Sequence, residues 1–179
     1  MNKVSKAAVF SLLFALGLPL AEPIAAHASG DTGTIRFTGE IRANTCTLAS
    51  KDVQVDLGDV NADDYRRAGT LRSAKPFTID LVGCSAELQG VRVKFEGTPD
   101  PTQPNYLAVG TGKSADATGM AIELFDGAGH TVGINSSTVE QLLHAGNNAL
   151  LFMAGYVSTT DKVKAGNANA VAEFTLQYR

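Results

Sequence analysis

Residues 172–179 have the sequence AEFTLQYR, and this short stretch decides the fold that the chain predicts. Apolar and polar residues alternate along it, so Phe174, Leu176 and Tyr178 share one face of a strand. The alternation runs to the last residue of the sequence. We therefore expect this to be the last strand of its domain, and if the sheet needs one more strand, that strand must come from elsewhere.

The same period-two alternation recurs through most of the chain, between joints rich in Gly, Asn, Asp and Pro. Seven or eight short strands in about 150 residues predict an all-β sandwich. Residues 138–144 have weak helical periodicity, and we expect one or two helical turns there. The expected strands are 35–41, 53–57, 77–84, 91–95, 120–125, 150–156 and 174–178.

The composition is that of an ordinary globular protein. The 179 residues are 44% hydrophobic and carry a formal net charge of −3, with no Trp. A disordered chain is disfavoured by this hydrophobic fraction, and the lack of a basic excess argues against nucleic acid as a partner.

The first 28 residues have the pattern of a secretory signal peptide. Lys3 and Lys6 precede an apolar run over residues 7–20, and the triplet 26–28, Ala-His-Ala, offers small residues before a cut. The apolar run is too short for a stable membrane span. We expect an exported mature protein that starts at Ser29 and has no membrane anchor.

Two cysteines, Cys46 and Cys84, lie in the expected mature part. An exported protein folds in an oxidising compartment, where pairing of two cysteines is the default. We expect a disulfide between them, which argues against a catalytic thiol.

Catalytic and metal-binding patterns are largely missing from the sequence. His130 and His144 are isolated, and neither a paired-histidine metal spacing nor a nucleophile elbow occurs. Residues 110–114 resemble the end of a phosphate-binding loop, but Leu107 stands where its first glycine belongs. The acidic stretch 59–64 lacks the spacing of a calcium loop. We expect no catalytic residues, no metal site and no cofactor.

The sequence resembles the pilin subunits of chaperone–usher fimbriae, of the type 1 major-subunit kind, over the whole mature chain. Gly166 is the fourteenth residue from the end and Tyr178 the penultimate one, as in the C-terminal motif of that family. The other matching stretches are residues 33–41 (GTIRFTGEI), Cys46 shortly after them, residues 57–60 (LGDV), residues 76–81 (PFTIDL) leading into Cys84, and residues 172–179.

This resemblance implies an incomplete immunoglobulin-like sandwich that lacks its last strand and is completed by a donor strand from another chain. It implies a signal peptide over residues 1–28, a donor-strand extension over residues 29–43 and a pilin domain over residues 44–179. A periplasmic chaperone would lend a strand first, and the extension of the next subunit would replace it after passage through an outer-membrane usher.

The resemblance also implies roles for particular residues. Ile35, Phe37 and Ile41 would insert into the groove of a neighbouring subunit, and Gly39 would lie where no side chain fits. The groove wall would include Gly166, Phe174, Leu176 and Tyr178, and Arg179 would carry the terminal carboxylate that chaperone residues hold.

We therefore expect a structural subunit of a surface fimbria that supports cell adhesion, with copies of itself or related pilins as partners. A minor or adaptor subunit is an alternative within the same family. A secreted lectin-like sandwich is a second alternative, and an enzyme is disfavoured by the missing constellations.

Overall fold

The computed structural model describes residues 34–39, 45–110 and 112–179. The expected signal peptide over residues 1–28 and most of the expected extension, including Ile41, lie outside the described residues. Residues 34–39 contain neither helix nor strand and belong to the first of two compact units. The folded domain lies in the second unit, Ile41–Arg179.

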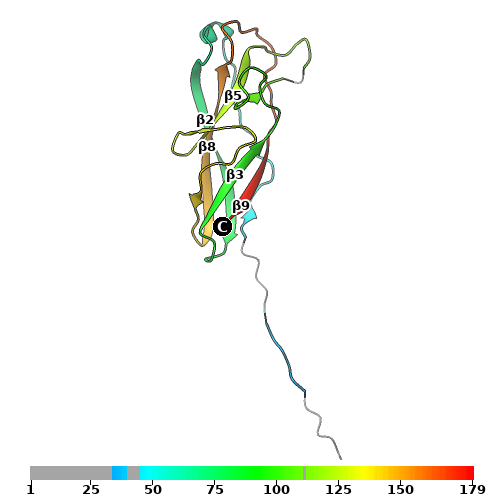
Figure 1. Cartoon of the computed structure of the whole chain (residues 1–179), viewed down its shortest axis with the longest axis vertical. Helices are drawn as coiled ribbons and strands as arrows, with labels where there is room; N and C mark the ends of the chain where they lie inside the picture. Colours follow the sequence, from blue (N-terminus) through cyan, green and yellow to red (C-terminus); the bar gives the residue numbers. More distant parts are fainter. Residues whose placement is uncertain (1–33, 40–44, 111) are drawn as a thin grey trace, which may run out of the picture. The chain divides into compact units, whose positions relative to one another are not determined.

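The domain is built from two sheets, as the sequence predicts (Figure 1). The larger sheet has the strand order β1-β2-β8-β5-β4, with β6 also paired to β5, and the smaller sheet has the order β7-β3-β9. All pairings between these strands are antiparallel. The elements of the described chain are β1 (Thr47–Leu48), the 3-10 helix η1 (Ala62–Tyr65), β2 (Leu71–Cys84), β3 (Gly90–Glu96), β4 (Leu107–Ala108), β5 (Met120–Asp126), β6 (Thr131–Val132), β7 (Gln141–Leu142), β8 (Gly146–Ser158) and β9 (Glu173–Tyr178).

The core between the sheets is centred on three phenylalanines. Phe77 on β2 faces Phe152 on β8 in the strand register, and their ring centroids lie 5.7 Å apart. Phe95 on β3 meets the ring of Phe152 edge-on, with centroids 5.1 Å apart. Because β3 belongs to the smaller sheet, this contact joins the two layers. The period-two alternation of each strand supplies the apolar face that makes such packing possible.

The strand expected to begin at Phe77 begins six residues earlier, at Leu71, and runs through Pro76. Proline usually interrupts a central strand because it has no N–H to donate. Here β1 pairs only with Leu81 and Val82, so the opposite edge of β2 has no strand partner in the described chain near Pro76. The proline is therefore tolerated within a long strand.

The helical turns expected over residues 138–144 are wrong. Gln141 and Leu142 form β7, which pairs with β3. Thr138 explains the difference, because its N–H donates to the Val93 carbonyl (2.8 Å) and its hydroxyl oxygen accepts from the Val93 N–H (3.0 Å). These tertiary bonds hold the segment extended against β3 and override its weak helical pattern.

His130 has a structural partner in the turn between β5 and β6. The buried carboxylate of Asp126 accepts hydrogen bonds from the N–H groups of Ala128 and His130, each at 2.9 Å, and lies 3.0 Å from His130 Nδ1. Burial alone would raise the pKa of Asp126, but the bonds from His130 and Ala128 outweigh it, and the pKa lies below its usual value. The stability that this carboxylate contributes is therefore lost as pH falls through its lowered pKa.

Cys46 and Cys84 are joined by a disulfide with 4.1 Å between their Cα atoms, which confirms the expected pairing. The bridge ties the residue before β1 to the last residue of β2. It reinforces a short pairing, because β1 contributes only Thr47 and Leu48 to the sheet.

We predict that reduction of this disulfide lowers the free energy of unfolding by roughly 4 kcal/mol, because the bridge closes a loop with a sequence separation of 38 residues. Urea unfolding of the protein with and without reductant measures the difference. The non-reduced protein should gain no mass on alkylation under denaturing conditions. Addition of two alkyl groups would contradict the bond in the mature protein.

Candidate functional site: an open groove beside the last strand

The last strand, β9, is an edge strand that pairs with β3 on one side only. Exposed and half-buried residues alternate without a break from residue 167 to residue 179. The alternation therefore continues the strand geometry in front of β9, although pairing with β3 begins only at Glu173. The half-buried positions are the even-numbered ones: Ala168, Ala170, Ala172, Phe174, Leu176 and Tyr178.

The register of β9 on β3 shows which main-chain groups face outward. Arg179 donates its N–H to the Gly90 carbonyl (2.9 Å), and the Gly90 N–H returns a bond of 3.4 Å. Hydrogen-bonded pairs alternate in an antiparallel ladder, so the odd-numbered residues of β9 bond to β3. Val93, opposite Leu176, accordingly directs its N–H and carbonyl to Thr138 instead. The even-numbered residues of β9 must then present their N–H and carbonyl groups at the open edge.

The opposite rim of the groove is residues 51–60, an extended stretch that lacks a ladder. Val53, Val55 and Leu57 are half-buried and alternate with exposed neighbours, as the sequence predicts. Within the described residues, the main chain from Val53 to Leu57 makes no hydrogen bond. The strand expected here is therefore an unpaired segment, because the chain leaves β2 after the bond from the Ala49 N–H to the Asp80 carbonyl.

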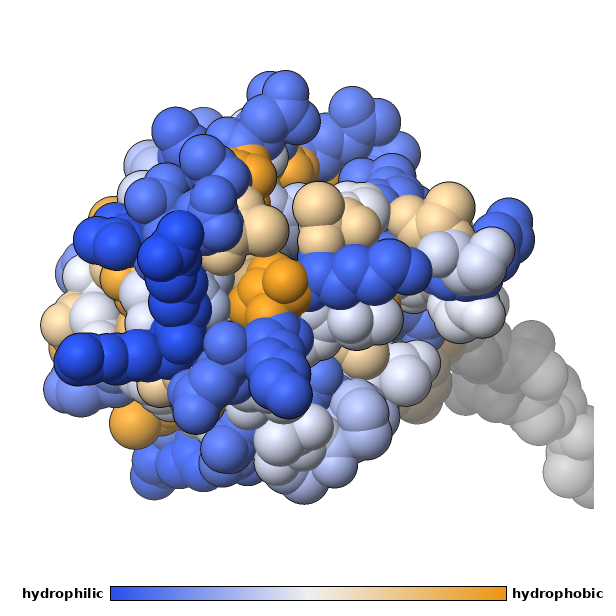
Figure 2. All heavy atoms as spheres, turned by 90° about the horizontal axis from the view of Figure 1, so that it is seen from above, coloured by the Kyte–Doolittle hydropathy of each residue, from blue (hydrophilic) through white to orange (hydrophobic). Residues whose placement is uncertain are grey.

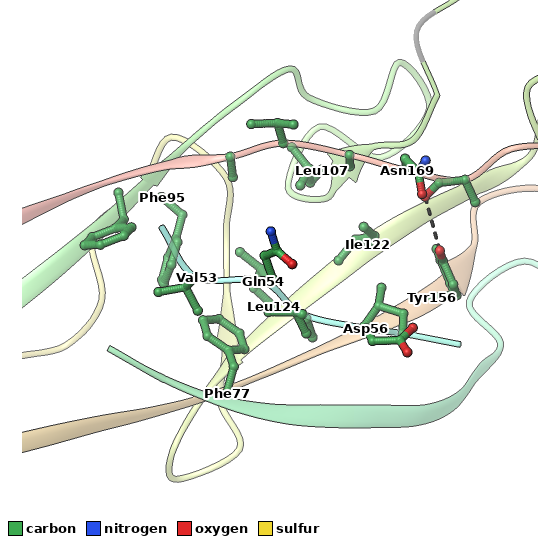
Figure 3. A pocket seen from close by; sticks show the side chains of 18 of the residues that line it. Val53, Gln54, Asp56, Phe77, Phe95, Leu107, Ile122, Leu124, Tyr156 and Asn169 are labelled. Carbon is green, nitrogen blue, oxygen red and sulfur yellow. Dashed lines mark hydrogen bonds between the residues drawn. The ribbon is translucent and has the colours of Figure 1, made fainter. Parts of the chain in front are cut away.

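Between the two rims lies a groove of about 1320 Å³ (Figure 3). One rim is residues 51–60 and the other is residues 166–174. Seen from above, apolar side chains appear in a hollow among hydrophilic ones (Figure 2). The hydrophobic core is thus open to solvent between the rims, instead of being closed by a further strand. The floor consists of core residues from both sheets: Phe77, Ile79, Phe95, Leu107, Ile122, Leu124 and Ala154, with Tyr156 beside them.

One end of the groove is built by a close approach of two main chains at Gly166. A Cβ atom added at Gly166 would lie 2.5 Å from the Ala117 nitrogen and 2.6 Å from the Ala115 carbonyl oxygen. Two hydrogen bonds hold the same chains together, from the Ala117 N–H to the Asn167 carbonyl and from the Asn167 N–H to the Ala115 carbonyl, each 2.9 Å. Only glycine fits at this position.

The carboxyl end of β9 lies near Cys46 of the disulfide. Burial raises the pKa of the Tyr178 phenol. A hydrogen bond with the main chain of Cys46 lowers this pKa, but by less than burial raises it. The guanidinium of Arg179 lies 3.3 Å from Glu140 Oε2, so this side chain is engaged within its own domain. Phe174, Leu176 and Tyr178 all pack against the core, and Phe174 also lines the groove. A place for Leu176 and Tyr178 in the groove wall stays a prediction.

The residues expected to act as a donor strand are exposed where the structure describes them. Ile35 is 78% and Phe37 90% exposed. Nothing lies within 4 Å of the position that a Cβ atom would take at Gly39. Ile41, the fourth expected donor residue, lies outside the described residues.

Possible metal ligands and the second histidine can be placed in the described residues. No group of three or more His, Cys, Asp or Glu side chains in them could hold a metal ion. The main chain of His144 exchanges two hydrogen bonds with the Asn148 side chain. Among these residues, no helix has the length and apolar character needed to cross a membrane.

Sequence reasoning missed two parts of the site. Ala168, Ala170 and Ala172 continue the inward face of the last strand, and the alternation of the first two with Asn167 and Asn169 was the available signal. The contribution of Tyr156 and of the loop over residues 115–117 carried no such signal, because both come from distant parts of the chain.

Comparison with known proteins finds matches among fimbrial proteins. The family described as fimbrial protein matches residues 35–179. Long polar fimbria protein A of Salmonella typhimurium is 36% identical over 99% of this chain and 99% of its own length. The fimbrial-like protein YcbV of Escherichia coli is 36% identical over 93% of this chain and 95% of its own length.

Solved structures agree. A type I fimbria protein of Burkholderia pseudomallei is 32% identical with a TM-score of 0.60, over 75% of this chain and 88% of that one. The P pilus rod subunit PapA is 25% identical with a TM-score of 0.64, over 75% of this chain and 99% of that one. The fold is therefore the immunoglobulin-like fold of a structural pilus subunit. The chain belongs to the fimbrial protein family, which is a family of structural proteins and not of enzymes.

We predict that Gly166→Ala lowers the free energy of unfolding by about 1–3 kcal/mol, because the added methyl group must displace main-chain atoms. Gly133→Ala is the matched control, since the nearest atoms to its new Cβ are at 3.5 Å, an ordinary contact distance. Denaturant unfolding of both variants measures the effect. Equal stability of the two variants would show that the approach at Gly166 is not tight.

Proposed function

We propose that the groove is filled by an extended segment from another copy of this chain or from a related pilin, so that subunits polymerise by donor-strand exchange. In this proposal residues 1–28 are a signal peptide, residues 29–43 are the donor segment and residues 44–179 are the pilin domain. The protein would act as a building unit of a fimbria at the cell surface.

The observation that carries this proposal is a pair of main-chain segments, one on either side of an apolar groove, whose groups lack hydrogen-bond partners among the described residues. The even-numbered residues of β9 offer N–H and carbonyl groups on one rim, and residues 53–57 offer theirs on the other. An added strand uses main-chain groups for affinity and alternate side chains for specificity. Such a strand would satisfy the open edge and cover the apolar floor together.

The chemistry of residues 35–41 suits this role. Ile35 and Phe37 share one face in period two and are exposed in their own subunit, so their apolar surface is available to a neighbour. Arg36 and Thr38 would face solvent along the outside of the groove. Gly39 would pass over a part of the floor that leaves no room for a side chain.

We propose two further partners for the same groove, a chaperone and an usher. An unfilled groove exposes apolar surface and strand edges, which favours aggregation before assembly. A periplasmic chaperone that lends a strand would protect the subunit, with Arg179 at the chain end as one contact. An outer-membrane usher would then bring the next donor segment to the groove.

We predict that Phe37→Asn blocks polymerisation. The change removes a buried phenyl ring and buries an unpaired amide at every joint, which costs roughly 3 kcal/mol or more and lowers each joining equilibrium by about a hundredfold or more. Filaments counted by electron microscopy should nearly vanish, while the level of soluble subunit stays unchanged because Phe37 is exposed in its own subunit.

Thr38→Asn introduces the same side chain at the adjacent position, on the opposite face, and should assemble like the parent protein. Normal filaments from Phe37→Asn would show that no neighbour buries this side chain. Loss of the soluble subunit in that variant would show instead that Phe37 belongs to the core of its own domain.

A further inference from the structure

Among the even-numbered residues that line the open edge from Ala168 to Tyr178, one main-chain carbonyl has a partner in the described part of the domain. The hydroxyl of Tyr156 donates a hydrogen bond of 3.2 Å to the Ala168 carbonyl (Figure 3). No hydrogen bond within the described residues engages the main chains of Ala170 or Ala172. The row of main-chain groups that an added strand could bond is therefore interrupted at the Ala168 carbonyl.

Tyr156 reaches this carbonyl from a strand of the larger sheet. It lies on β8, opposite Ile122 of β5 in the larger sheet, and its half-buried ring is part of the groove lining. The bond to Ala168 thus connects β8 of the larger sheet to the segment that precedes β9, at one end of the groove. It differs in this respect from the ladder bonds of β9, which stay within the smaller sheet.

The neighbouring odd-numbered residues confirm that the Ala168 carbonyl is on the groove side. Asn169 accepts from the Gly110 N–H at 2.8 Å, and Asn167 exchanges bonds with Ala115 and Ala117. These bonds are on the edge where β3 pairs with β9 further along the strand. By alternation, Ala168 presents its main chain to the groove.

The rim formed by residues 51–60 also comes close to Tyr156. Burial raises the pKa of the Tyr156 phenol, and the carboxylates of Asp56 and Asp59 nearby raise it further. The phenol is accordingly held protonated and remains a hydrogen-bond donor at neutral pH. Asp56 and Tyr156 appear at the same end of the groove in Figure 3.

We propose that Tyr156 is an end stop of the groove: by occupying the Ala168 carbonyl, it limits the ladder available to an incoming strand to Ala170–Tyr178 and thereby fixes the register of that strand. This inference rests on the proposed donor-strand function.

A stop of this kind answers a physical problem of strand addition. A slip of one residue turns the apolar face of the donor to solvent and is strongly disfavoured, but a slip of two residues keeps every side chain on the correct face. The apolar pattern of residues 35–41 therefore discriminates weakly between registers two residues apart. A blocked acceptor at one end of the ladder removes one of these alternatives.

The test uses a full-length chain carrying Phe37→Asn, which does not donate, together with a synthetic peptide of residues 29–43 as the incoming strand. Amide hydrogen exchange of the chain is measured by NMR with and without the peptide, in the parent and with Tyr156→Phe added. The peptide should slow exchange at Leu176 in both chains. In an antiparallel ladder the N–H and carbonyl of one residue bond the same partner residue, so an incoming strand seats on the Ala168 N–H only when the Ala168 carbonyl is free. The peptide should therefore leave exchange at Ala168 almost unchanged in the parent and slow it by roughly tenfold in Tyr156→Phe.

Tyr106→Phe is the matched control, because Tyr106 is half-buried and its hydroxyl makes no hydrogen bond within the described part of the chain. This control should match the parent at Ala168. Protection of Ala168 already in the parent, or its absence in Tyr156→Phe, would overturn the end stop while leaving donor-strand addition intact. No protection at Leu176 in any chain would refute the proposed function and the end stop with it.

Discussion

Half of the main-chain hydrogen-bonding groups of the last strand have no partner among the residues that the structure describes, and the rest of the architecture is arranged around that fact. The odd-numbered residues of β9 bond to β3, so its even-numbered residues face an open edge, as do Ala170 and Ala172 just before it. Residues 53–57 run along the other side of the gap without a ladder of their own. A missing element between two such segments leaves both unsatisfied, which explains why the core opens at this place and not at another.

The same side chains serve stability and association in this protein. Phe77 and Phe95 belong to the hydrophobic core and to the floor of the groove, so whatever covers the groove also completes the core. Binding of a strand and stability of the fold are therefore linked, because a ligand that binds only the folded state stabilises it in proportion to its concentration and affinity. A subunit with such an open groove is more stable when a strand is bound in the groove than when the groove is empty.

Much of the fold could be predicted from period-two patterns, because these patterns report which face of a strand is buried. The inward face of Phe174, Leu176 and Tyr178 and the alternation of Val53, Val55 and Leu57 were both visible in this way. Patterns do not report pairing, so the absence of a ladder along residues 53–57 was not foreseen. Nor do they report tertiary hydrogen bonds, such as those by which Thr138 holds its segment against β3 or Tyr156 reaches across to Ala168. The part of the site that depends on such contacts could be found only in three dimensions.

The disulfide has a mechanical consequence. Tension applied to the chain ahead of Cys46 does not have to pass through β1, whose two-residue pairing would peel apart easily. The covalent bridge passes the load directly to Cys84 at the end of β2, which is the longest strand of the described domain and is aligned with β8 over most of its length. A pull along β2 loads many of these hydrogen bonds in parallel, as in shear, whereas peeling would break them one after another. The bridge thus lets a thin two-sheet domain carry load along its chain.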